Sequence, residues 1–180
     1  MQVALYVHPF DLTALENHGG LARLRDLGIG ELSLATSYRG GRWLTPWNPR
    51  RRVRFLEDGC VHFRPGADYG RLQPKASSEV PSGGPSPLEQ LCRQAPAAGM
   101  KVRAWTVFGH NTRLGLTAPD VTVENAFGDR YPYALCPSSR DVQDYHEALV
   151  RDLASHDGLG SLELEALGQM GIAHSSHHDK

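Results

Sequence analysis

The chain has 180 residues, of which 40% are hydrophobic and 22% are charged. This composition is typical of a folded globular protein and excludes a largely disordered chain. The 19 basic and 20 acidic residues leave a formal net charge of −1. That balance excludes a bulk attraction to nucleic acid or to an anionic membrane, so we expect neither as a partner.

The three cysteines, Cys60, Cys92 and Cys136, are widely spaced and odd in number. This pattern does not fit a disulfide framework and is typical of a reducing compartment. The sequence contains no apolar run of about 18 residues, as a membrane span requires, and no signal-peptide pattern. We therefore expect a cytoplasmic protein.

The predicted elements alternate between strand and helix. Residues 3–8, 29–37, 101–108 and 161–168 are predicted strands, and residues 13–27, 86–98 and 139–156 are predicted helices. This alternation is typical of a parallel α/β sheet. The helix-to-strand connections are short, whereas residues 38–87 and 109–137 form long strand-to-helix connections. Barrels and doubly wound sheets carry their sites on such loops, at the carboxyl ends of the strands.

The first long connection, residues 38–87, is rich in Gly, Pro and Arg and is predicted to be a loop insertion. Within it, residues 52–55 and 60–63 flank the turn sequence Glu57-Asp58-Gly59. Two short apolar runs around such a turn predict a hairpin.

The last predicted strand shows a period of two. Leu162 and Leu164 point one way, and Glu163 and Glu165 point the other way. If helices cover the leucines, the glutamates lie on the opposite face of the strand. That face is exposed to solvent in an antiparallel strand, whereas in a barrel it faces the interior.

The same alternation, applied to all four strands, collects polar and aromatic residues on one face. They are Tyr6, His8, Glu31, Ser33, Arg103, Trp105, Glu163 and Glu165. A doubly wound sheet would bury this face under helices at a high desolvation cost, whereas a barrel interior accommodates it. The predicted fold is therefore a parallel (β/α) barrel of the TIM type.

That barrel is incomplete, because four βα units fall short of the eight that span about 250 residues. We expect residues 1–180 to form a single half-barrel domain, the N-terminal half. The first and fourth strands would be open edges, which a second chain or a missing C-terminal half would pair with.

Depth in the barrel separates the expected roles of the inward residues. Glu31, Arg103 and Glu163 lie deeper and are predicted to form a structural ion pair layer. Glu165 and His8 lie at the strand ends, beside the long loops. Glu165 is therefore the predicted catalytic or ligand-binding acid.

Aromatic and amide side chains near the third strand favour a carbohydrate ligand. Trp105 is followed by His110 and Asn111, and then by Asp129 and Tyr131. Aromatic rings stack on the apolar faces of sugars, while amides and carboxylates bond hydroxyl groups. Trp43 and Trp47 offer further stacking surfaces. Alternatively, these polar residues hold the loop together and the tryptophans pack as a lid.

Three motifs carry a resemblance to a known family: the Ala104-Trp105 strand end, the loop ending in residues 133–137 (YALCP), and the strand of residues 162–165 (LELE). Together with the intervening helix, they resemble uncharacterised bacterial, actinobacterial-type glycoside-hydrolase-like barrel proteins, over most of the chain. The resemblance implies a carbohydrate substrate and no cofactor.

The resemblance also implies roles for individual residues. Glu165 would be the general acid/base, opposite a carboxylate from a later strand that this chain lacks. His8, His110 and Asn111 would bind sugar hydroxyls, and Trp105 would form the floor of the pocket.

Two other functions remain open. His174, His177 and His178 follow the fourth strand and, with His8 and Glu165, would suit a divalent-metal-dependent hydrolase or isomerase. The first strand, however, lacks the His-x-His pattern of metal-dependent hydrolase barrels. The other alternative is a noncatalytic carbohydrate-binding barrel fragment.

Overall fold

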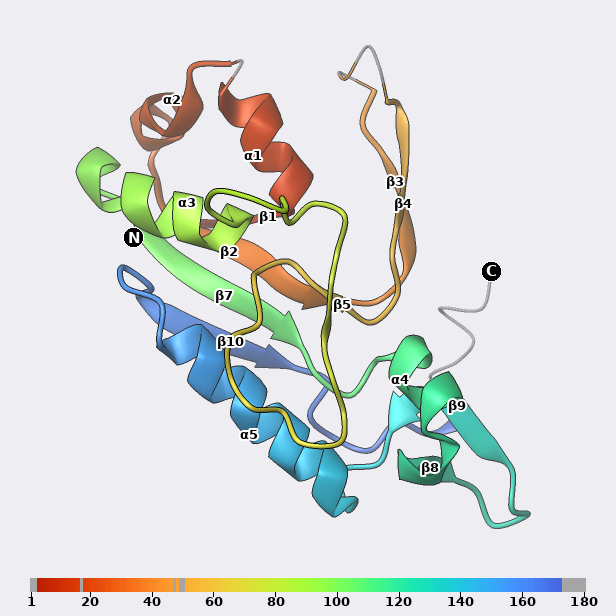
Figure 1. The fold of residues 1–180 in the computed structure, drawn as a ribbon. Coiled ribbons are helices and arrows are strands. Elements are labelled where there is room, and N and C mark those ends of the chain that lie inside the picture. The colour runs from red at the N-terminus through yellow and green to blue at the C-terminus, as the bar shows by residue number, and fades with distance from the viewer. Residues whose placement is uncertain (1–2, 17, 47, 49–50, 173–180) are drawn as a thin grey trace.

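A computed structural model describes residues 3–16, 18–46, 48 and 51–172. Its main sheet contains four parallel strands in the order β10-β7-β2-β1 (Figure 1). They are β1 (Val3–Val7), β2 (Ile29–Tyr38), β7 (Lys101–Val107) and β10 (Ser161–Glu165). Their order across the sheet follows their order in the chain, as in a barrel. The predicted α/β fold with a parallel sheet is confirmed.

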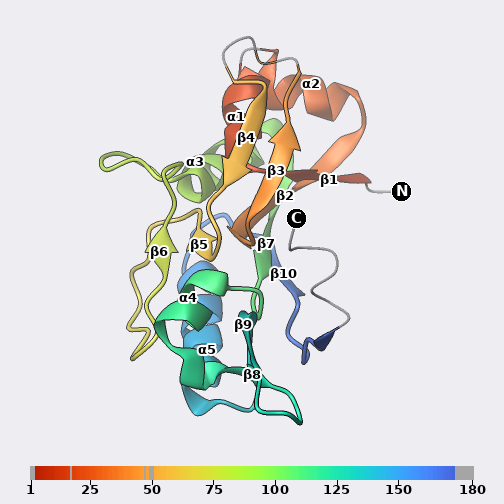
Figure 2. The same cartoon turned by 90° about the vertical axis from the view of Figure 1, so that its right-hand side faces the viewer.

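Helices pack against one face of this sheet. They are α1 (Pro9–Glu16), α2 (Gly20–Asp26), α3 (Pro87–Gln94) and α5 (Arg140–Ala154). Figure 2 shows α3 and α5 on the same side of the strands, with no described helix on the opposite side. The core between these layers joins Leu34 and Val102 of the strands to Leu91 and Leu149 of the helices.

Local sequence signals fix the ends of these helices. Ser86 and Glu89 form a capping box at the start of α3, with Pro87 at its first position. The single helix expected before residue 28 is instead two helices. Gly19 and Gly20 have φ angles of 90° and 60°, which break the helix between α1 and α2.

The first insertion contains the hairpin β3 (Gly41–Leu44) and β4 (Val53–Leu56). The sequence predicts that residues 52–55 pair with residues 60–63, and this prediction was wrong. Residues 53–56 pair with β3 instead, whereas β5 (Cys60–Val61) pairs with the end of β2 and with β6 (Lys75–Ala76). Side chains of the predicted turn explain this difference. The Glu57 carboxylate accepts from Lys75 Nζ at 2.9 Å, and Asp58 accepts from Thr112 N at 2.7 Å.

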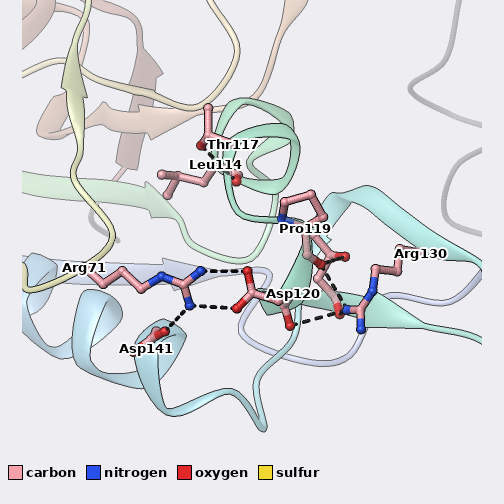
Figure 3. Close-up of polar contacts among 8 residues, drawn as sticks. Arg71, Leu114, Thr117, Pro119, Asp120, Arg130 and Asp141 are labelled. Atoms are coloured by element: carbon pink, nitrogen blue, oxygen red, sulfur yellow. Dashed lines mark hydrogen bonds and ion pairs between the residues drawn. The ribbon is translucent and has the colours of Figure 1, made fainter.

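The second insertion is more ordered than the sequence predicts. It forms α4 (Thr112–Thr117), a single 3₁₀ turn at Pro119–Val121, β8 (Thr122–Glu124) and β9 (Arg130–Leu135). Another 3₁₀ turn, Pro96–Ala98, lies outside this insertion and follows α3. Arg71 ties this insertion to the first one and to α5 (Figure 3). Its guanidinium bonds Asp120 and Asp141, each at 2.7 Å, and Arg130 bonds the carbonyl of Pro119 at 3.0 Å.

The two outermost strands of the sheet are open. Within the described ranges, β1 pairs only with β2, and β10 pairs only with β7. Leu164 of β10 is consequently 45% exposed although it lies on the helix-covered face. None of the described helices is both long and apolar enough to cross a membrane.

Candidate active site

The uncovered face of the sheet carries a polar layer that reaches all four strands. Glu163 on β10 accepts hydrogen bonds from Tyr6 on β1 at 2.6 Å and from Ser33 on β2 at 3.0 Å. Arg103 on β7 lies between Glu163 and Glu31, at 3.4 Å and 2.9 Å. The alternation predicted from the sequence therefore places these residues on one face.

Electrostatics keeps this layer charged. Burial opposes the ionisation of Glu163, but hydrogen bonds from Tyr6, Ser33 and Arg103 outweigh it and lower its pKa below the usual value. The hydrogen bond to Glu163 raises the pKa of Tyr6, whose hydroxyl therefore stays a donor. The layer thus sets one guanidinium, that of Arg103, against two carboxyl groups, those of Glu31 and Glu163.

Closer to the strand ends, His8 lies in a box of four aromatic rings. Ring centroids lie 4.5 Å away for Trp43, 5.0 Å for Tyr38, 5.3 Å for Phe10 and 5.8 Å for Trp105. His8 is 4% exposed, and neither of its ring nitrogens has a hydrogen-bond partner among the described residues. Burial, followed by the nearby His62, lowers the pKa of His8 to about 4, so the imidazole is neutral at pH 7.

Glu165 lies at the rim of this box, exposed at the end of β10. Its Oε2 accepts from the indole nitrogen of Trp105 at 2.5 Å. Trp105 in turn packs edge-on against Tyr6 and Tyr38, with centroid distances of 5.0 and 4.9 Å. The carboxylate therefore fixes the orientation of a half-buried indole that faces the uncovered side.

Two residues of the box, Tyr38 and Phe10, were not found from the sequence. Strict alternation from Glu31 directs Ser37, not Tyr38, toward the inner face. The pairing of β2 with β7 shifts register between Ala35 and Ser37, and this bulge turns Tyr38 inward. Phe10 belongs to the first turn of α1, where strand alternation does not apply.

The other predicted sugar-binding residues lie outside the box. Asn111 has a structural role, because its side-chain oxygen accepts a hydrogen bond from Leu114 N at 2.9 Å and caps the start of α4. His110 bridges to Ala134 on β9 and packs near Tyr133, and Tyr131 stacks on Tyr133 at 5.8 Å. Figure 2 shows β9 and the β3–β4 hairpin on opposite sides of the strand ends.

Asp129 lies in the exposed turn between β8 and β9, where its carboxylate accepts from Asn125 at 3.1 Å. The sugar-binding roles of His110, Asn111, Asp129 and Tyr131 stay predictions.

The histidines of the metal alternative, His174, His177 and His178, lie outside the described residues. Within the described part of the chain, no group of three or more His, Cys, Asp or Glu side chains is arranged to hold a metal ion.

Comparisons with solved structures identify the class of fold. The chain superposes on a maltogenic α-amylase, AmyB, from Thermotoga neapolitana, with a TM-score of 0.56 and 14% identity over 98% of this chain. A putative α-amylase from Salmonella typhimurium gives a TM-score of 0.54 and 18% identity over 96% of this chain. A glycoside hydrolase family 20 β-N-acetylglucosaminidase gives a TM-score of 0.50 and 16% identity over 94%.

These likenesses show a fold, that of part of a glycoside hydrolase barrel. The chain spans only 41%, 28% and 38% of those three proteins, respectively. No protein family matches the sequence, and no curated protein matches it either.

Proposed function

We propose that this chain forms the carbohydrate site of a glycoside-hydrolase-type barrel. The observation that carries the proposal is the Trp105–Glu165 pair at the rim of the aromatic box, because it places an oriented indole and a carboxylate side by side at the carboxyl ends of the strands. In this fold, ligands bind at that end. A pyranose ring would stack on Trp105, with its hydroxyls reaching the Glu165 carboxylate.

Glu165 is the general acid/base of the proposed site. One oxygen accepts from Trp105, while Oε1 has no hydrogen bond within the described ranges and is exposed on the uncovered face. It can therefore reach a glycosidic oxygen. Hydrolysis requires a second carboxylate across the sugar, at a separation that sets the stereochemical outcome. We assign that group to the strands that would complete the barrel.

His8 is the second polar contact of the proposed site. Its two ring nitrogens are buried without partners, which is costly for a polar group. A sugar hydroxyl that displaces Trp43 from the ring would supply the missing partner. Neutral imidazole offers one donor and one acceptor, which matches a hydroxyl.

The open edges of β1 and β10 belong to the same proposal. An apolar groove of about 300 Å³ flanks the outer edge of β1, lined by Leu5, Val7, Ala14 and Leu15 among others. Further parallel strands with covering helices would pair with both edges and fill this groove. Such strands would enclose the polar layer around Arg103.

Binding of neutral oligosaccharides tests the proposal. Maltohexaose and chitohexaose, chosen from the activities of the structural neighbours, are titrated while tryptophan fluorescence and heat are recorded. Trp105→Ala should weaken binding about tenfold, a loss of about 1.4 kcal/mol. Phe127→Ala is the matched control, because Phe127 is 91% exposed on the remote β8–β9 turn. Absence of binding to both sugars, or unchanged binding by Trp105→Ala, contradicts the proposal.

A further inference from the structure

The β3–β4 hairpin and its flanks concentrate positive charge beside the proposed sugar site. Residues 38–56 contain six arginines and no aspartate or glutamate, in a chain whose formal net charge is −1. Five of these arginines are described, namely Arg39, Arg42, Arg51, Arg52 and Arg54. The distribution of charge along the chain is therefore strongly uneven, although the total is balanced.

Most of this charge is not neutralised within the fold. Arg54 pairs with Glu79 at 3.3 Å, and Arg39 lies over the Tyr38 ring at 5.5 Å. Arg42, Arg51 and Arg52 have no ion-pair partner within the described part of the chain, and all three are exposed. Exposed cations without partners remain available to an anionic ligand.

The two faces of the hairpin differ in their contacts. Trp43 and Arg54 pair across the strands on the inner face, where Trp43 reaches His8. On the outer face Arg42 pairs with Phe55, which is 73% exposed, beside Leu44, which is 75% exposed. Figure 1 shows the hairpin standing beyond the end of β2. One side of it thus borders the sugar site while the other carries cationic and apolar groups.

We propose that this hairpin binds the carboxylate groups of an acidic glycan, a chain of uronic acid residues, of which another sugar stacks on Trp105 at the rim of the aromatic box. The inference rests on the proposed function and specifies its substrate class. A guanidinium binds a carboxylate through two parallel hydrogen bonds, and Arg42 beside Phe55 offers such a fork next to an apolar surface for the ring. A single exposed ion pair contributes little to affinity, but several unpaired arginines on one hairpin can bind several carboxylates of the same glycan chain.

The hairpin favours a glycan over a nucleic acid. A domain that binds nucleic acid usually carries a net positive charge, whereas this chain has a formal net charge of −1. The hairpin is also joined directly to the box through Trp43, whose ring lies 4.5 Å from His8. A chain bound along the hairpin would therefore lead into the proposed site.

The experiment compares hexagalacturonate with its fully methyl-esterified form by calorimetry, at about 20 mM and 200 mM NaCl. These two ligands share the sugar and differ in charge. The wild-type chain should bind the acid at least about tenfold more tightly at low salt, with a smaller preference at high salt. The triple variant Arg42→Gln/Arg51→Gln/Arg52→Gln should lose this preference and keep its affinity for the ester.

The matched control is Arg23→Gln/Arg93→Gln/Lys101→Gln, which removes the same charge from exposed positions on α2, α3 and the start of β7. It should retain the preference. Equal binding of acid and ester, or a preference that survives the hairpin variant, overturns the inference and leaves the sugar site standing. Failure to bind either form overturns the inference, whereas the titrations with maltohexaose and chitohexaose decide the sugar site separately. Tighter, hairpin-dependent binding of a 12-base-pair DNA duplex also overturns the inference.

Discussion

Tyr6 and Glu163 bond each other at 2.6 Å although two strands separate their own strands in the sheet. Neighbouring strands lie about 4.8 Å apart, so β1 and β10 are about 14 Å apart along the sheet. Only long side chains on the same face can meet across that span, and a curved sheet turns them toward each other. The bond is therefore the contact that most directly shows a barrel-like inner face.

Neutralising Glu163 should destabilise this layer in a pH-dependent way. Glu163→Gln removes the charge that Arg103 and Tyr6 contact, and we expect a loss of about 1–2 kcal/mol at pH 7, because the site is partly screened by solvent. The folded-state pKa of Glu163 is lowered, so its contribution is present above the unfolded value near 4.3 and is lost as pH falls through the folded value.

Urea unfolding at pH 7 and at pH 3 measures this difference. The gap between wild type and Glu163→Gln should shrink at the lower pH. Glu147→Gln serves as the control, because Glu147 pairs with Arg151 on the exposed side of α5 and should change stability by less than about 0.5 kcal/mol. A gap that is independent of pH contradicts the assignment.

A second carboxylate, Asp152 of α5, holds the loop after β5 in place. It is 7% exposed and accepts from Tyr69 OH at 2.6 Å, Gly66 N at 2.8 Å and Ala67 N at 3.2 Å. Asp152→Ala leaves three donors without an acceptor, so we expect a loss of about 2–4 kcal/mol in the free energy of unfolding. Asp144→Ala on the exposed side of α5 should cost much less, and similar losses for both would show that Asp152 has no special role.

Acidification should destabilise the protein through His8. Its folded-state pKa is about 4, below the unfolded value near 6.5, so the folded state binds fewer protons between these two values. Stability is therefore fully present above pH 6.5 and falls as pH decreases toward 4. The slope contributed by one such group approaches about 1.4 kcal/mol per pH unit.

His8→Phe removes this titration while keeping an aromatic ring inside the box. The variant should gain stability relative to wild type as pH is lowered from 7 to 4.5, as measured by urea unfolding at each pH. His18→Gln is the matched control, because it replaces a histidine at an exposed position. Parallel pH profiles for wild type and His8→Phe would contradict the burial of His8.

The inner face was predictable because strand alternation holds wherever a strand stays regular. Glu163 and Glu165 of β10, and Arg103 and Trp105 of β7, follow the period of two without interruption, and they meet as that period requires. Tyr38 was missed because a register shift lies between Ala35 and Ser37, and no turn residue marks it. A bulge depends on pairing with a neighbouring strand, which local sequence does not specify.

The insertions were harder to predict for a related reason. Strand β9 contains Pro132, which argues against a strand, but among the described strands β9 pairs with β8 alone, and its isolated bridge to His110 is at Ala134 rather than at Pro132. An edge position tolerates the missing donor. Likewise, strand 53–56 pairs with Gly41–Leu44 because Glu57 and Asp58 are engaged by distant groups, Lys75 and Thr112. Such long-range contacts leave no periodic signal.

Replacing Glu165 separates binding from catalysis. Glu165→Gln keeps an oxygen acceptor for Trp105 and removes the titratable proton, so oligosaccharide affinity should stay within about threefold of wild type. Turnover is measured as reducing ends released from maltohexaose or chitohexaose, in a protein that also carries the strands completing the barrel. It should fall by at least about 100-fold, the range of general acid/base catalysis. Glu147→Gln, on α5, should hydrolyse at the wild-type rate. Unchanged turnover in Glu165→Gln would show that this carboxylate binds sugar without transferring a proton, and would favour the noncatalytic alternative.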